Sequence, residues 1–275
     1  IGSYFQEAGY TTGYTGKWHN KLDNFRRNTK RYDANSDPRS PENVKMLKED
    51  YEEAQNVIRS LGWDYVESLN DGNTDQRPLH AMRTHNLDWT AKGALDFIDQ
   101  ASDSDKPFYL NVSASVIHGP HTIESIDSDI NITEYGYSDE DLNGYLPPRK
   151  SIRERIEAAG KEYNHTSAGA LWLDDLVGAI ENKLKECGID EDTIIVFTSD
   201  HGDFPHKATC YERGVKARLL YMAPCEPGGS KAQPRLLDSF SHLLLSYVFL
   251  QIFHLFLAKA LASLPHCALN ALNQN

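Results

Sequence analysis

The chain has 275 residues, of which 40% are hydrophobic and 25% charged, and its formal net charge is −12 at pH 7. This composition is that of an ordinary globular protein, and the length suffices for one large domain, or one domain plus a small addition. The acidic balance argues against a nucleic-acid-binding protein, which normally carries a basic face. The four cysteines are scattered and form no C-x-x-C pair, so they say little about the redox compartment.

The first part of the chain alternates between helical and strand-like segments. Gly9 is a suitable stop for an N-terminal helix, and Asn86 is a suitable cap for a later one. Gly16 opens a turn that carries Lys17, Trp18 and His19. The predicted elements are a helix ending at Gly9, a strand over Tyr10–Thr15, a polar loop over 20–41, a helix over 42–60, a strand over Trp63–Val66, a helix from Asn86 through Ala101 and a strand over Pro107–Ile117.

The second part begins with an acidic, turn-rich excursion over residues 123–148, a suitable place for substrate specificity. The pattern then predicts a long helix over roughly 151–187 with Gly188 as its C-cap, and strands over 193–198 and Arg218–Ala223. Helices that alternate with apolar strands indicate an α/β fold, in which a mainly parallel or mixed sheet is sandwiched by helices.

The last forty residues are unlike the rest. Leu243–Ala258 is mostly apolar, but its 16 residues fall short of the roughly 20 that span a bilayer. A buried helix is favoured over an interfacial or membrane segment, and an artefact of the gene model or reading frame is a third alternative.

Polar clusters follow three of the predicted strands. Asp200 and His201 come directly after the strand 193–198, where open α/β sheets place their ligands, and are able to hold a divalent cation. Their alternative role is to cap a turn. Lys17 suits a tetrahedral anion and His19 can orient a group or donate a proton. The other candidates are His118, His121 and Lys207, for each of which a plain loop or surface role is the competing interpretation.

Taken together, these segments resemble a type I sulfatase of the alkaline-phosphatase-like superfamily. The matching pieces are residues 6–19, 107–121, 174–188 and 192–224, so the resemblance covers roughly residues 1–235 and implies a sulfatase catalytic domain, with the loops 20–85 and 122–165 much less alike. The ordered set of motifs is far more specific than any one of them. From Ser239 on the sequence does not continue the family pattern, which leaves 236–275 as an atypical apolar tail.

The resemblance implies a role for each candidate residue. Asp200 and His201 match the second half of a calcium site. Lys17 and Lys207 match the lysines that bind the sulfate oxygens and neutralise the charge developing on the ester. His19 matches the histidine that supports the nucleophile. His121 best matches the histidine that contacts sulfate and protonates the leaving alcohol, with His118 as the alternative, because Ile123 stands where the family usually has a second proline.

The sequence also departs from the family. Sulfatases attack sulfur with a formylglycine made from the Cys or Ser of a C/S-x-P-x-R motif, and they carry an Asp-Asp pair on their first strand; neither feature occurs in these residues. We therefore expect an N-terminally truncated catalytic domain that is essentially inactive by itself, from a parent that hydrolyses a small-molecule or carbohydrate sulfate ester.

The rival interpretations are a phosphonate or phosphodiester hydrolase of the same superfamily, and a non-catalytic binding scaffold. Membrane association is not expected, and oligomeric state is not readable. The sequons at Asn131 and Asn164 are compatible with a secreted, lysosomal or periplasmic parent.

Overall fold

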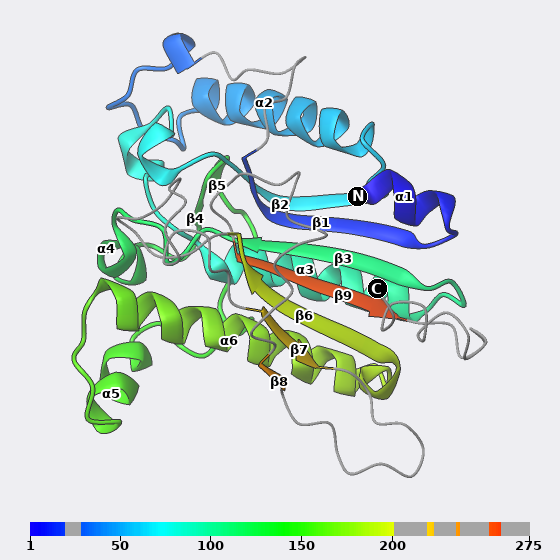
Figure 1. Ribbon diagram of the computed structural model, residues 1–275. Helices are drawn as coiled ribbons and strands as arrows, with labels where there is room; N and C mark the ends of the chain where they lie inside the picture. Colours follow the sequence, from blue (N-terminus) through cyan, green and yellow to red (C-terminus); the bar gives the residue numbers. More distant parts are fainter. Residues whose placement is uncertain (20–28, 201–218, 223–234, 237–252, 260–275) are drawn as a thin grey trace, which may run out of the picture.

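In the computed structural model, residues 1–19, 29–200, 219–222, 235–236 and 253–259 are described; side chains are described only up to Asp200. The fold is a mixed α/β sheet with helices on both faces (Figure 1). Its strands are β1 (Thr11–Trp18), β2 (Tyr65–Asp71), β3 (Phe108–Ala114), β6 (Thr193–Ser199), β7 (Leu219–Met222), β8 (Arg235–Leu236) and β9 (Phe253–Lys259). A separate two-stranded hairpin pairs β4 (Ile132–Thr133) with β5 (Gly136–Tyr137).

The main sheet has the strand order β2-β1-β3-β9-β6-β7-β8. β1 runs parallel to both β2 and β3, whereas β9 is antiparallel to β3 and to β6. Because β3 and β6 both oppose β9, they run parallel to each other. The carboxyl ends of β1, β2, β3 and β6 therefore share one edge of the sheet, which lies near α4, β4 and β5 on the left of Figure 1.

The helices are α1 (Gly2–Glu7), α2 (Pro41–Arg59), α3 (Leu87–Ser102), α4 (Thr122–Ile126), α5 (Ser151–Ala158) and α6 (His165–Glu186). Short 3-10 turns, labelled η, lie at Thr29–Arg31, Thr74–Gln76, His80–Met82 and Asp190–Asp192. Among the described residues, no helix has both the length and the apolar character that a membrane crossing needs.

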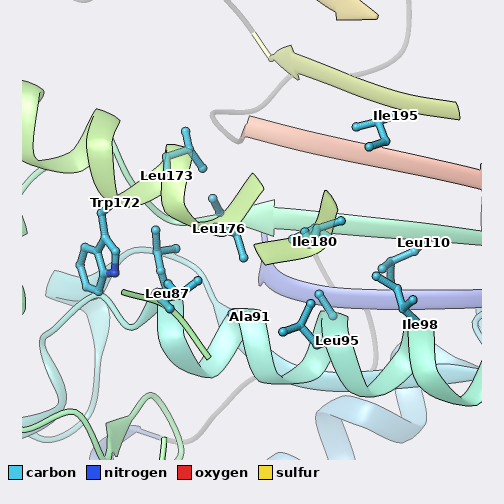
Figure 2. Close-up of a cluster of buried hydrophobic side chains, with 14 of the residues drawn as sticks. Leu87, Ala91, Leu95, Ile98, Leu110, Trp172, Leu173, Leu176, Ile180 and Ile195 are labelled. Atoms are coloured by element: carbon cyan, nitrogen blue, oxygen red, sulfur yellow. The ribbon is translucent and has the colours of Figure 1, made fainter. Parts of the chain in front are cut away.

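The larger hydrophobic core lies between α3, α6 and one face of the sheet (Figure 2). Trp172 is fully buried at one end of this core, and its ring lies 4.8 Å from the guanidinium carbon of Arg149. The side chains labelled in Figure 2 come from α3 (Leu87, Ala91, Leu95, Ile98), β3 (Leu110), α6 (Trp172, Leu173, Leu176, Ile180) and β6 (Ile195). A second core on the opposite face joins Tyr14, Trp18, Val66 and Tyr109 of the sheet to Ala54 and Ile58 of α2.

Several predicted elements are confirmed. Asn86 caps α3, since its side-chain oxygen accepts a hydrogen bond from the Trp89 amide at 3.0 Å. The helix predicted over 42–60 and the strand predicted over 193–198 form where the pattern placed them, whereas the strand predicted over Pro107–Ile117 forms but ends three residues early, at Ala114. The predicted α/β class, with a mixed sheet between helices, is thus correct.

Four predicted elements need correction. The strand over Tyr10–Thr15 continues to Trp18, so Lys17 lies in β1 rather than in a turn, because β1 stays paired with β2 up to Asp71. β2 starts at Tyr65 and runs past Val66 to Asp71. The helix over 151–187 is two helices, α5 and α6, separated at Gly160, which adopts φ +68°.

The fourth correction concerns the tail. The segment Leu243–Ala258 was predicted to be a buried helix, but Phe253–Lys259 forms β9, a strand paired on both sides. A central strand of an α/β sheet with helices on both faces typically has a continuous apolar sequence, and such a run cannot be told from a buried helix by its pattern alone. Residues 243–252 lie outside the described part of the chain.

Candidate functional site

The candidate site lies at the shared carboxyl edge of β1, β2, β3 and β6. Lys17 and His19 stand at the end of β1, the His118–His121 loop follows β3, and Asp200 follows β6. The parallel relation of β3 to β6 across β9 therefore gathers residues that are far apart in the sequence. His201 and Lys207, the remaining predicted site residues, lie outside the described residues.

Lys17 is placed by an irregularity in β1. The register with β2 shifts between Thr15 and Gly16, and Gly16 adopts φ +89°. The Lys17 side chain is only 1% exposed, and its ammonium donates a hydrogen bond to Asn73 Oδ1 at 2.7 Å. A buried ammonium at a strand end, oriented by a neutral amide, is suited to meeting an anion. Asn73 was not singled out in the sequence, because nothing local marks it as the partner of Lys17.

The two histidines of the loop after β3 have different surroundings. His118 is half-buried, its Nδ1 contacts the carbonyl oxygen of Gly119, and its charge acts on the ring of His85 together with that of Lys17. His121 is also half-buried, adopts φ 74° and precedes α4 as its N-cap residue. The structure thus places both His118 and Lys17 within electrostatic range of His85.

His85 is a site neighbour that the sequence analysis missed. The residue is 2% exposed; its Nδ1 lies 2.9 Å from Ser115 Oγ and its Nε2 lies 2.9 Å from the carbonyl oxygen of Pro120. Burial lowers the pKa of His85 to about 3, with the nearby groups Arg77, His118 and Lys17 contributing to the shift and the hydrogen bond to the Pro120 carbonyl oxygen opposing it. The only sequence signal was a histidine directly before the helix cap Asn86.

A buried ion pair joins Arg77 to Glu134 beside the same edge. Their side chains are 1% and 0% exposed, and Arg77 also donates a hydrogen bond to the Asp71 carbonyl oxygen at 2.5 Å. Glu134 lies in the turn between β4 and β5, within the excursion that was predicted to set specificity. The pair therefore fixes this hairpin against the end of β2. Its participants were not predictable, because the sequence does not show which charges are buried.

Asp200 follows β6 directly and is half-buried. Its carboxylate is a hard oxygen ligand of the kind that Ca²⁺ prefers. Within the described part of the chain, however, no group of three or more His, Cys, Asp or Glu residues is placed to hold a metal ion. The described residues thus supply one candidate calcium ligand, Asp200, and do not form a complete calcium site.

A cleft of about 790 Å³ lies elsewhere, between α3, α6 and the segment around Tyr145. None of the predicted site residues lines it. Its walls carry Asp96, Asp99, Asp174, Asp175 and Glu186 against a single lysine, Lys183. An anionic ligand is not favoured there, since carboxylates repel it.

Comparisons with known proteins find similarity to several sulfatases. The chain is 27% identical over 210 residues to an ulvan-active sulfatase of Formosa agariphila, covering 72% of this chain and 34% of that protein. It is 28% identical to the uncharacterized sulfatase YidJ of Escherichia coli (82% and 47% covered) and 24% identical to an endo-4-O-sulfatase of Bacteroides thetaiotaomicron (86% and 47% covered). The chain thus spans less than half the length of each of these relatives.

The family model described as Sulfatase matches residues 1–221. This range includes the four strands β1, β2, β3 and β6, whose carboxyl ends form the candidate site, and most of β7. The chain belongs to the sulfatase family.

Proposed function

We propose that this chain supplies part of the site of a sulfate ester hydrolase. The observation that carries the proposal is the buried ammonium of Lys17, which lies at the shared carboxyl edge of the sheet. Lys17 and His118 both act electrostatically on the same buried ring, that of His85. A sulfate ester is an anion that gains charge on its leaving oxygen as it is cleaved. A fixed cation together with a proton donor is the combination that stabilises such a reaction.

The roles of this chain's residues follow from their chemistry. Lys17 binds a sulfate oxygen while Asn73 holds its ammonium in place. Lys207, outside the described residues, is proposed as the second cation. His121 is proposed to contact the sulfate and protonate the leaving alcohol, with His118 as the alternative. His19, which directly follows β1, is proposed to support the nucleophile.

The proposed reaction needs two further groups in the whole protein. A formylglycine would provide the nucleophile, and the 275 residues contain no C/S-x-P-x-R motif from which it is made. A calcium ion would neutralise charge on the bound sulfate; Asp200 and His201 are the residues proposed to hold it, with further oxygen ligands required. Neither group is assigned a geometry by the residues described.

The substrate class that we propose is a carbohydrate sulfate ester. One relative is named for its activity on ulvan. The ion pair of Glu134 with Arg77 holds the hairpin near the end of β2, and we propose that the hairpin forms a wall of the site. This wall is suited to recognising the alcohol part of an ester, because it adjoins the strand ends without being part of the sheet.

The test is a paired assay of sulfate and phosphate esters on the whole protein. Lys17→Ala is expected to lower kcat/KM for the sulfate ester at least about 100-fold, because it removes a fixed charge from the transition state. His118→Ala and His121→Ala, measured side by side, identify the proton donor. Lys30→Ala, at an exposed lysine, is the matched control.

Each outcome of this assay has a defined meaning. Retained activity in Lys17→Ala would overturn the site assignment. Faster turnover of the phosphate ester would support the phosphodiesterase alternative. Absence of turnover of either ester by the wild type would leave a binding scaffold as the better account.

A further inference from the structure

We propose that His85 is a positioning residue, which holds the loop from Ser115 to His121 and thereby positions His118 and His121 at the carboxyl edge of the sheet. Its catalytic consequence rests on the function proposed above, whereas its effect on the loop does not. Three hydrogen bonds from one buried residue carry the inference.

The first step concerns the ring itself. The Pro120 carbonyl oxygen only accepts hydrogen bonds, so the nitrogen facing it, Nε2, must carry the proton. In the neutral ring Nδ1 is then an acceptor, and the Ser115 hydroxyl donates to it at 2.9 Å. The low pKa of His85 is consistent with this neutral form. Both ring nitrogens are therefore used, each by a different part of the loop.

The second step concerns the span of these bonds. Ser115 directly follows β3, and Pro120 lies two residues after His118, so the ring links the two ends of the segment that carries His118. The His85 amide donates to Ser125 Oγ at 2.8 Å, and Ser125 Oγ donates in turn to the His121 carbonyl oxygen at 2.5 Å. One residue thus contacts the loop before, within and after its two histidines.

The third step concerns the support behind His85. The next residue, Asn86, caps α3 and accepts a hydrogen bond from Arg149 Nη2 at 2.8 Å. Arg149 also pairs with Asp88 at 2.7 Å and donates to the Ser125 carbonyl oxygen at 3.0 Å. His85 is therefore anchored on a helix start that is itself held by a buried network. A group placed on a rigid element fixes a loop better than another loop residue would.

The alternative is that His85 serves only the stability of the fold. Two matched variants, His85→Asn and His85→Gln, separate this alternative from a positioning role. His85→Asn places an amide near the Nδ1 position, so it keeps a partner for Ser115 and loses the bond to Pro120. His85→Gln reaches the Nε2 position, so it is able to restore the donor to Pro120. Ser115→Ala removes only a hydroxyl and serves if the histidine variants fail to fold. His80→Asn, at an exposed histidine that contacts Asn35, is the control.

The first measurement is hydrogen–deuterium exchange of this chain. In His85→Asn, and in Ser115→Ala, the amides between 116 and 125 should exchange at least about tenfold faster, the effect of losing one buried hydrogen bond. The exchange rates of the β3 amides should stay as in the wild type, and so should the exchange rates of the loop amides in the control variant His80→Asn. Unchanged protection of the loop in both variants would overturn the proposal.

The second measurement is kcat and KM for a sulfate ester in the whole protein. His85→Asn should lower kcat more than it raises KM, and His85→Gln should recover part of the loss. A more mobile loop with unaltered kcat overturns the positioning role. If the wild type turns over no sulfate ester, the function proposed above fails, while faster loop exchange still supports the role of His85 in holding the loop.

Discussion

Gly16 shows how one residue without a side chain places a neighbouring functional group. It adopts φ +89° at the register shift of β1, and a Cβ added there would lie 2.1 Å from the Ser113 carbonyl oxygen. Only glycine fits both the positive φ and the close approach of β3. The irregularity that it permits precedes Lys17 immediately, so the position of the ammonium depends on this glycine.

Gly16→Ala is therefore expected to destabilise the protein by roughly 3 kcal/mol or more, since backbone strain of about 1–3 kcal/mol adds to a clash with main-chain atoms. The control is Gly160→Ala, where φ is +68° but no atom lies within 4 Å of the added Cβ. That variant should lose only about 1–2 kcal/mol. Urea denaturation of both variants measures the difference; equal losses would show that the contact with β3 is unimportant.

His85 also predicts a pH dependence of stability. Its pKa is about 3 in the folded protein against 6.5 for an ordinary histidine, and Lys17, Arg77 and His118 are the positive or titratable groups that act on it. Above pH 6.5 the ring is neutral in both states. As the pH falls below 6.5, the unfolded chain binds a proton that the folded protein does not bind until about pH 3, so the folded state loses stability over this window.

Between pH 7 and pH 5 this single group should cost the wild type about 2 kcal/mol. His85→Gln removes the titration, so the free energies of unfolding of wild type and variant should converge by that amount at pH 5. Other groups titrate in both proteins and cancel in the comparison. Denaturation at the two pH values tests this, with His80→Gln as the control; parallel behaviour of wild type and His85→Gln would contradict it.

The sequence allowed prediction of which residues belong to the site better than of which residues contact one another there. Lys17, His118 and Asp200 stand out in the sequence because charged or imidazole groups follow strand-like segments. Asn73 and His85 do not stand out, because their importance arises only from burial and from contacts over long sequence separations, such as that of His85 with Pro120. Such contacts are properties of the fold and have no local pattern.

At the scale of elements, the boundary between α5 and α6 shows where periodicity is insufficient. The helical pattern over 151–187 was continuous enough to predict one helix. The structure separates two, because Gly160 takes a positive φ and Asn164 starts α6 as an N-cap. Asn86 was recognised as a cap because a polar loop precedes it, whereas Asn164 follows residues that suit a helix. The two helices are then held together by Arg155 and Asp175, whose side chains approach to 2.6 Å.

Asn164→Ala is expected to destabilise the protein by about 1 kcal/mol, the usual value of an N-cap. The Asn164 side-chain oxygen accepts hydrogen bonds from the amides of Thr166 and Ser167, each at 3.0 Å, and alanine cannot replace it. Asn182→Ala, at an exposed position within α6, should be neutral or slightly stabilising, because alanine has the higher helix propensity. Thermal unfolding of the two variants gives the comparison; a neutral Asn164→Ala would mean that α6 does not depend on this cap.

At the scale of the whole molecule, β9 is the element that joins the two halves of the sheet. Six of its residues pair with β3, and its seven residues pair with β6, so it lies between the strand that leads to His118 and the strand that leads to Asp200. The sequence predicted the α/β class but not this connection. The pairing of β9 joins residues that lie between 54 positions apart (Ser199 and Phe253) and 149 positions apart (Tyr109 and Ala258), and an apolar run alone does not reveal its partners.

The central place of β9 leads to a prediction about cooperativity. Leu255 lies opposite Val112 on one side and Phe197 on the other, so its amide faces a paired strand whichever way it points. Leu255→Pro removes that donor and should cost about 3 kcal/mol or more, which corresponds to a fall in Tm of roughly 10 °C for a protein of this size.

Leu236→Pro is the matched control for this prediction. Leu236 lies in β8, which among the described strands pairs only with β7 and stands at the edge of the sheet, where proline is tolerated. Its Tm should therefore fall much less than that of Leu255→Pro. Calorimetric unfolding of both variants decides the question. Equal Tm values would mean that β9 does not hold the two halves of the sheet together.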